Sequence, residues 1–214
     1  MIEKCKRILV PAQSIVDFLE FGNPNAKKVL LILHGYGQNA EEIYESLKDI
    51  IPEDYHCIIP NGVFPMPKQR ADKIYYRFAW YFYNTIEQKY YIDFTYPTSV
   101  LNSFLANINP SARPTTIVGY SQGGYLAPFL GQAYSATSRV IGINCNYRYD
   151  MLTPEINFDL YSIHGIGDPI VNFDNSKNSF EQLKPQLLKG EFIPVDNKTH
   201  DIDEEVKNTL LRFL

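Results

Sequence analysis

The sequence contains few cysteines, a single tryptophan and no long apolar run. Its three cysteines, Cys5, Cys57 and Cys145, lie far apart and form no C-x-x-C motif. Cys57 and Cys145 fall in apolar segments, which predicts buried thiols and fits a reducing compartment. No segment approaches the roughly 20 apolar residues of a membrane span. Residues 1–7 lack the apolar stretch of a signal peptide. We therefore expect a cytoplasmic protein without a membrane span.

Positive charge is also sparse. Lysine and arginine number 20 against 24 acidic residues, which gives a net charge of −4. A nucleic-acid surface would need clustered basic residues, so we expect no nucleic-acid partner. With 214 residues, of which 45% are hydrophobic and 21% charged, the chain has the balance of a globular protein. This predicts one domain, residues 1–214, with a sizeable core.

Apolar strand-like segments alternate with helical segments along the chain. We predict strands at residues 8–10, 18–21, 29–33, 56–59, 115–118, 140–144, 160–164 and 191–195, and helices at residues 41–50, 98–108, 125–134, 176–188 and 203–213. Such alternation predicts an α/β fold, with a mostly parallel central sheet and helices on both faces.

The most informative segment is G-Y-S-Q-G at residues 119–123. It follows the predicted buried strand at 115–118 and precedes a helical segment in which Pro128 would lie in the first turn. Strand, tight turn and helix form the context of a nucleophile elbow, in which a serine hydroxyl is exposed on a strained turn. Ser121 is therefore the candidate nucleophile. The alternative is a glycine-rich turn without chemistry.

A serine nucleophile needs a general base, and the base needs a carboxylate that orients it. In α/β-hydrolases these follow the nucleophile in the order acid, then histidine, and only His164 and His200 follow Ser121. Asp168 comes after a predicted strand, whereas His200 comes after the next apolar run and before the last helix. We predict the triad Ser121, Asp168 and His200, with His164 supporting the acid loop. Alternative acids are Asp150, Asp174 and Asp196.

The apolar run at residues 29–33 ends in H-G-Y-G, residues 34–37. Glycines there free the main chain, so that an N–H group can point at developing negative charge. The second donor would be the N–H that follows the nucleophile. We predict an oxyanion hole formed by the main-chain N–H groups of Tyr36 and Gln122, with His34 bonding across the turn as a structural residue.

Three segments carry a family resemblance: H-G-Y-G at 34–37, G-Y-S-Q-G-G at 119–124 and H-G-I-G-D-P-I-V at 164–171. In order and spacing they resemble the acyl-protein thioesterase family, also called the phospholipase/carboxylesterase family of small α/β-hydrolase serine esterases. The likeness extends from about Lys28 to the C-terminus and includes A-W-Y at 79–81. Ile166 and Phe82 stand where the family often has acidic residues. The resemblance implies hydrolysis of carboxylic esters or thioesters with no cofactor and no metal.

Two connections bear on the substrate. Residues 144–160 are too few for a separate cap domain, which predicts an open site. Residues 61–97 form a long connection with little regular pattern but many aromatic residues. We predict that it supplies a wall for short to medium acyl groups, with Trp80 as the substrate-binding residue and roughly half of the other rings in the core. The substrate would be a small molecule or an acylated carrier. The alternatives are an inactive hydrolase-fold protein that binds a ligand or partner, or an acyltransferase or amidase with the same triad.

Overall fold

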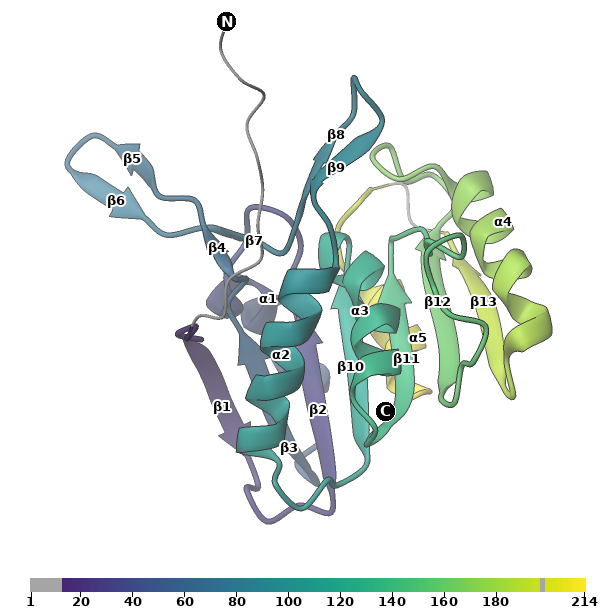
Figure 1. Ribbon diagram of the computed structural model, residues 1–214, viewed down its shortest axis with the longest axis horizontal. Coiled ribbons are helices and arrows are strands. Elements are labelled where there is room, and N and C mark those ends of the chain that lie inside the picture. Colours follow the sequence, from purple (N-terminus) through teal and green to yellow (C-terminus); the bar gives the residue numbers. More distant parts are fainter. Residues whose placement is uncertain (1–12, 197–198) are drawn as a thin grey trace, which may run out of the picture.

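The computed structural model describes residues 13–196 and 199–214, so the strand predicted at residues 8–10 lies outside the described residues. Within them, seven strands form a central sheet in the order β1-β3-β2-β10-β11-β12-β13 (Figure 1). β1 pairs antiparallel with β3 at one edge, and the other neighbours are parallel. The strands are β1 (Phe18–Gly22), β2 (Lys28–Leu33), β3 (Tyr55–Pro60), β10 (Thr115–Tyr120), β11 (Thr137–Ile143), β12 (Asp159–Gly165) and β13 (Gly190–Val195).

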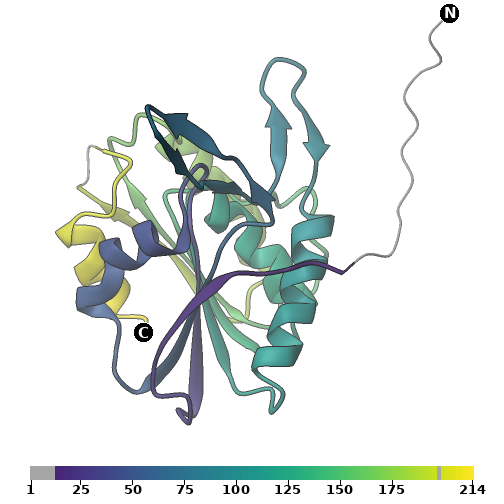
Figure 2. The same cartoon turned by 90° about the vertical axis from the view of Figure 1, so that its left-hand side faces the viewer.

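Helices cover both faces of this sheet. Figure 2 shows α1 (blue) and α5 (yellow) on one side and α2 (teal) on the other. The helices are α1 (Ala40–Leu47), α2 (Thr95–Ile108), α3 (Gln122–Ala133), α4 (Phe173–Leu183) and α5 (Glu204–Leu211), and 3₁₀ turns η1 (Lys48–Ile50) and η2 (Lys184–Gln186) extend α1 and α4. The predicted mostly parallel α/β architecture is confirmed.

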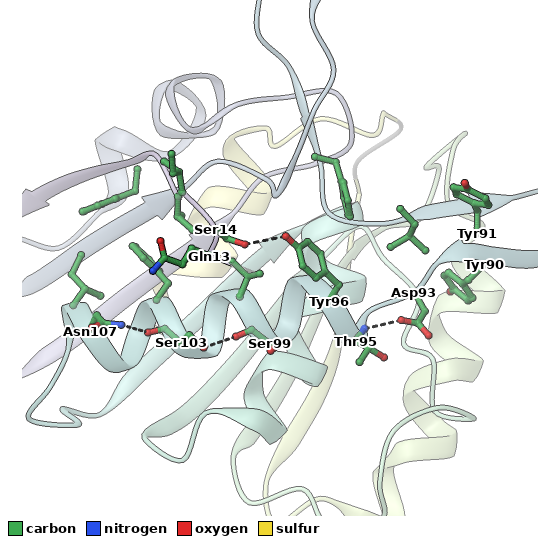
Figure 3. Close-up of a pocket in the computed structure, with 18 residues that line it drawn as sticks. Gln13, Ser14, Tyr90, Tyr91, Asp93, Thr95, Tyr96, Ser99, Ser103 and Asn107 are labelled. Atoms are coloured by element: carbon green, nitrogen blue, oxygen red, sulfur yellow. Dashed lines mark hydrogen bonds between the residues drawn. The ribbon is translucent and has the colours of Figure 1, made fainter. Parts of the chain in front are cut away.

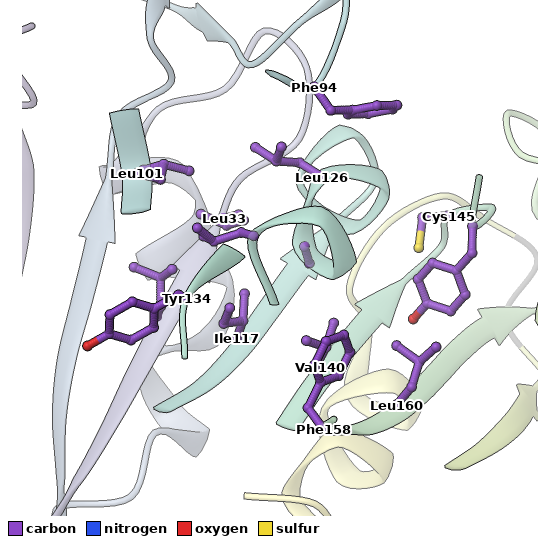
Figure 4. Close-up of a cluster of buried hydrophobic side chains, with 14 of the residues drawn as sticks. Leu33, Phe94, Leu101, Ile117, Leu126, Tyr134, Val140, Cys145, Phe158 and Leu160 are labelled. Carbon is purple, nitrogen blue, oxygen red and sulfur yellow. The ribbon is translucent and has the colours of Figure 1, made fainter. Parts of the chain in front are cut away.

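Alternating side chains of β2 pack into two separate hydrophobic cores, one on each face of the sheet. Val29, Leu31 and Leu33 face the larger core, with α2, α3 and α4 (Figure 4). Leu30 and Ile32 face the second core, with α1 and α5. A strand buried on both faces reads as a continuous apolar run, which is why the sequence pattern identified it. Cys57 and Cys145 are buried in these cores, as predicted, and burial raises the pKa of both thiols.

One helix differs from its predicted start. α3 begins at Gln122, immediately after Ser121, so Pro128 lies inside the helix and not in its first turn. The reason is local: the turn at Ser121 leads directly into helical backbone, and Gly123 and Gly124 are already helical. At α1 the Asn39 side chain caps the helix by accepting a hydrogen bond from the N–H of Glu42 at 2.9 Å.

The long connection after β3 has more regular structure than its sequence indicated. Three two-stranded sheets form in it: β4 (Phe64–Pro65) with β7 (Phe78–Ala79), β5 (Lys68–Arg70) with β6 (Lys73–Tyr75), and β8 (Phe82–Asn84) with β9 (Lys89–Ile92). The expectation of little regular pattern was wrong, because strands this short carry no detectable alternation. Figure 1 shows the β5–β6 and β8–β9 hairpins standing out from the same end of the molecule. In contrast, residues 144–158 contain no helix or strand, which agrees with the absence of a cap domain.

Candidate active site

Ser121 occupies a strained turn between β10 and α3. Its backbone has φ 49° and ψ −117°, a conformation that residues other than glycine rarely adopt. Its N–H donates to the carbonyl of Ile143 at 2.8 Å, which ties the turn to the neighbouring strand β11. A Cβ atom on Gly123 would collide with the carbonyl oxygen of Leu33. The elbow therefore packs directly against the end of β2, and only glycine allows this approach.

The structure brings the predicted triad residues together. Nε2 of His200 lies 2.8 Å from Oγ of Ser121, and Nδ1 of His200 lies 2.7 Å from Oδ2 of Asp168. The other oxygen of Asp168 accepts hydrogen bonds from the N–H groups of Ile170 and Val171 at 2.8 and 2.9 Å. These bonds hold the carboxylate in the orientation that meets the imidazole. The arrangement can move a proton from the serine hydroxyl to the imidazole.

His164 lies beneath the acid loop and not against the serine. Its ring is fully buried, and Nε2 donates to the carbonyl of Val171 at 3.0 Å. Nε2 is also 3.8 Å from Oδ2 of Asp168. Burial lowers the pKa of His164, so the ring is neutral and this contact is not an ion pair. His164 thus holds the residue that in turn hydrogen-bonds Asp168, the supporting position that the sequence indicated.

His34 is a structural histidine in the turn after β2. Its Nε2 accepts the N–H of Gly62 at 2.9 Å, and its Nδ1 donates to the carbonyl of Gly35 at 2.7 Å. Burial lowers the pKa of His34 to about 4. The neutral imidazole ties the loop after β2 to the loop after β3, and both of its nitrogens are used in these two bonds.

Of the two residues predicted to form an oxyanion hole, Tyr36 lies in the loop after β2 and Gln122 is the first residue of α3. Gly37, at φ 70°, donates its N–H to the carbonyl of Phe78 at 2.9 Å, and Phe78 donates back to Gln38 at 2.9 Å. These two bonds fix the loop. In the part of the chain that the structure describes, the N–H groups of Tyr36 and Gln122 donate to no protein acceptor. Both are free for a ligand oxygen.

Trp80 does not occupy the predicted place in a substrate wall. Its side chain has no exposed surface, so it cannot contact a substrate in this structure. Its indole Nε1 donates to the carbonyl of His34 at 2.8 Å, and its main-chain N–H donates to Oε1 of Gln122 at 2.9 Å. The Gln122 amide also donates to the carbonyl of Tyr81 at 2.9 Å. Trp80 therefore connects the two segments that carry the free N–H groups, a role that sequence reasoning missed.

The other aromatic residues of this connection divide between core and surface. Tyr81 and Phe94 are buried with Trp80. Phe94 stacks on Phe129 of α3 with ring centroids 4.2 Å apart. Exposed rings lie on or beside the hairpins: Tyr75, Tyr76, Tyr83, Tyr91 and Tyr96. Fewer rings are buried than the half that was expected, and the ring chosen for the substrate belongs to the core.

A large cavity of about 1570 Å³ lies along α2, away from the three candidate catalytic residues. Figure 3 shows Ser99, Ser103 and Asn107 of α2 along it, with a hydrogen bond of 3.0 Å between Ser14 and Tyr96. None of Ser121, Asp168 and His200 lines this cavity. The three residues of the predicted triad therefore lie outside this cavity.

A parallel sheet with a serine on the strand–helix turn, and with acid and histidine on later loops, defines the α/β-hydrolase fold. The sequence profile of the phospholipase/carboxylesterase family matches residues 17–214. The chain belongs to this family. Membership supports a hydrolase. A comparison with curated protein sequences finds no match.

Solved structures with the same fold include three named hydrolases. Esterase PE8 superposes with a TM-score of 0.73 at 20% identity, covering 92% of this chain and 97% of its own. Acyl-protein thioesterase 2 of Zea mays gives 0.72 at 16% identity, covering 94% and 97%. A Bacillus cereus carboxylesterase gives 0.71 at 18% identity, covering 93% of both chains. At these identities the likeness establishes the fold.

Proposed function

We propose that the protein is a serine hydrolase that cleaves carboxylic ester or thioester bonds of short to medium acyl substrates. The observation that carries the proposal is the chain of two short contacts, 2.8 Å from Ser121 Oγ to His200 Nε2 and 2.7 Å from His200 Nδ1 to Asp168 Oδ2. Family membership supports hydrolysis as the reaction. The proposal includes both ester and thioester bonds because the structural relatives include an esterase and a thioesterase.

In the first step His200 takes the proton of Ser121 as Oγ attacks the acyl carbon. The carbonyl oxygen gains negative charge, which the N–H groups of Tyr36 and Gln122 bind. Asp168 accepts the Nδ1–H bond and stabilises the charged imidazole without itself taking the proton. The imidazole then gives its proton to the leaving alcohol or thiol, and an acyl-enzyme on Ser121 remains.

In the second step His200 takes a proton from water, whose oxygen attacks the acyl carbon. The tetrahedral intermediate uses the same two N–H groups. Its collapse breaks the bond to Ser121, and the serine oxygen recovers a proton from the imidazole. The products are the carboxylic acid and the free enzyme.

Exposed apolar side chains on the loops that leave β2 and β12 replace Trp80 as candidate acyl contacts. Tyr36 is 60% exposed, Ile166 is 55% exposed and Ile170 is 71% exposed. The carboxyl ends of parallel strands meet at one edge of the sheet, so these loops border the edge that holds Ser121. Apolar groups there favour an acyl substrate over a charged one.

A fluorophosphonate probe tests the nucleophile. The wild-type protein should gain one probe mass, and Ser121→Ala should gain none. The matched control Ser103→Ala changes an exposed serine of α2 and should label like the wild type. Labelling of folded Ser121→Ala would contradict the assignment. A folded wild-type protein that neither labels nor hydrolyses p-nitrophenyl esters and acyl thioesters would favour the inactive, ligand-binding alternative.

His200→Ala tests the base. We expect turnover to fall by roughly 10⁴-fold, and Asp168→Asn to cost somewhat less. Circular dichroism should show that both variants are folded. A His200→Ala variant with near wild-type turnover would remove the imidazole from the mechanism.

A further inference from the structure

The main-chain carbonyl of His200 accepts hydrogen bonds from two side chains of the central sheet. Oη of Tyr120 donates to it at 2.7 Å, and Nδ2 of Asn144 donates to it at 3.1 Å. Tyr120 is the last residue of β10, and Asn144 directly follows β11. His200 itself lies between β13 and α5, away from both strands in sequence. The main chain of His200 is thus held by the strand that leads to Ser121 and by the residue that follows the neighbouring strand.

The backbone conformation and the side-chain amide of Asn144 both suit its position between the two loops. It is fully buried and has φ 49°, a left-handed conformation that asparagine tolerates better than most residues. Its Oδ1 accepts the N–H of Gly165 at 3.0 Å, at the start of the acid loop, while its Nδ2 reaches His200. One amide therefore links the acid loop to the loop of the base. A side chain needs both a donor and an acceptor to do this.

Tyr120 supplies the second bond. Its ring is almost buried, and its centroid lies 5.3 Å from that of His200. Burial raises the pKa of Tyr120, so the hydroxyl stays protonated and can donate. Because Tyr120 precedes Ser121 in the chain, this bond sets the backbone of His200 relative to the serine.

We propose that Tyr120 and Asn144 are positioning residues that clamp the His200 main chain and so hold its imidazole between Ser121 and Asp168. This inference rests on the proposed function, in which His200 is the base. The side chain of His200 makes its two contacts only while its backbone stays in place. A displacement of about 1 Å in a catalytic group can cost roughly 100-fold in rate.

The test uses Tyr120→Phe, Asn144→Gly and the double variant. Phenylalanine removes only the hydroxyl, and glycine accepts the positive φ of Asn144 while removing both amide bonds. Each single change should lower kcat for p-nitrophenyl acetate by about threefold, because one donor remains, and the double variant by about 100-fold, with KM within about twofold. The matched control is Tyr134→Phe. Tyr134 is also buried, and its hydroxyl accepts from Asn109 at 2.9 Å near the opposite edge of the sheet.

A second readout does not depend on activity. The proton on His200 Nδ1 should give a strongly downfield NMR signal while Asp168 accepts it. This signal should weaken in the double variant and persist in Tyr134→Phe. A folded double variant with kcat within about threefold of the wild type, or with reduced kcat and an unchanged signal, would overturn the clamp. If the double variant does not fold, the single Tyr120→Phe variant decides with its own limits: a kcat about threefold below the wild type together with a weakened signal supports the clamp, whereas a wild-type kcat or an unchanged signal overturns it.

The two proposals can fail separately. A wild-type protein that shows the His200 signal but neither hydrolyses esters nor labels at Ser121 would contradict the proposed function. In that case the dependence of the signal on Tyr120 and Asn144 still supports or overturns the clamp.

Discussion

Individual buried polar groups explain much of the geometry around Ser121. Trp80 is fully buried, yet its indole N–H has a specific partner in the carbonyl of His34. A buried carbonyl that loses its donor costs about 1–3 kcal/mol. The same indole fixes the turn that leads to Tyr36. A core residue can therefore control a reaction that it does not touch.

Trp80→Phe should lower kcat more than it changes KM. Phenylalanine keeps an aromatic ring but removes the donor to His34, which loosens the loop that holds the N–H of Tyr36. Loss of optimal geometry at one oxyanion donor should reduce kcat by about tenfold or more, with KM within about twofold. Ester hydrolysis kinetics provide the measurement. Phe129→Leu, a change in the same core without a lost hydrogen bond, should leave kcat close to that of the wild type. An altered KM with an unchanged kcat would instead support the abandoned substrate-wall role.

The lowered pKa of His34 predicts that the stability of the folded protein depends on pH. Its pKa is about 4 in the folded protein and 6.5 in the unfolded chain, so the unfolded chain binds more protons between these values. Its contribution is complete above pH 6.5 and is lost as the pH falls toward 4. The free energy of unfolding should therefore drop by about 2 kcal/mol between pH 7 and pH 5 on account of His34.

Urea unfolding of the wild type and His34→Gln at the two pH values isolates this effect. Glutamine can still accept the N–H of Gly62 but does not titrate. The variant should lose less stability on acidification than the wild type. The remaining dependence has the same sign from His164, whose pKa burial also lowers. Equal slopes for the two proteins would contradict a neutral, buried His34.

At the scale of elements, the sequence was informative where a signal is local. The strand at β2 is a continuous apolar run, and the elbow at Ser121 is a five-residue motif, so both could be predicted. The hairpins from β4 to β9 could not, because two- to four-residue strands are too short for a period. Contacts between distant segments, such as Asn144 with His200, leave no trace in local pattern. The burial of Trp80 depends on neighbours that are distant in sequence, such as His34 and Gln122, which is why its role was misassigned.

The start of α5 provides a test at the same scale. Asp203 caps the helix by accepting the N–H of Val206 at 3.0 Å, and Val206 and Leu210 pack in the second core. Asp203→Ala should reduce the free energy of unfolding by about 1 kcal/mol, whereas Asp203→Asn should retain most of it. Denaturant unfolding measures both.

The activity of the folded Asp203→Ala variant is also informative. We expect unchanged kcat, because His200 is held by Tyr120 and Asn144 and not by the cap of α5. A marked loss of kcat at full folding would show that the position of His200 depends on the helix.

At the scale of the whole molecule, the described residues include no cap domain between β11 and β12. The connection from β11 to β12 has no helix or strand that could form a cap. The β5–β6 and β8–β9 hairpins stand out from the body of the molecule (Figure 1). None of the helices in the described residues has the length and hydropathy to cross a membrane. Under the proposed function, we therefore expect side chains of the loops at this edge to bind the acyl group.

We expect the preference of the enzyme for acyl chain length to follow from this architecture. Each methylene buried against the loops contributes about 0.8 kcal/mol, so kcat/KM should rise about threefold to fourfold per carbon until the apolar surface ends. Emulsified long-chain triglyceride should be a poor substrate, because no lid covers a lipid-sized apolar surface when substrate is absent. A series of p-nitrophenyl esters from acetate to palmitate, with triglyceride alongside, measures the profile.

A double substitution, Ile166→Ser with Ile170→Ser, should flatten that rise while acetate hydrolysis continues. Both side chains are exposed on the acid loop, so their removal takes away apolar surface without disturbing the core. The control is Leu188→Ser. Leu188 is 84% exposed and lies just before the amino end of β13, whereas Ile166 and Ile170 follow the carboxyl end of β12. This control variant should keep the wild-type chain-length profile. If the double variant keeps the same slope, the acyl chain lies elsewhere, and the exposed rings of the hairpins become the next surface to change. Rapid cleavage of triglyceride would show that the open edge binds far more apolar surface than these loops provide.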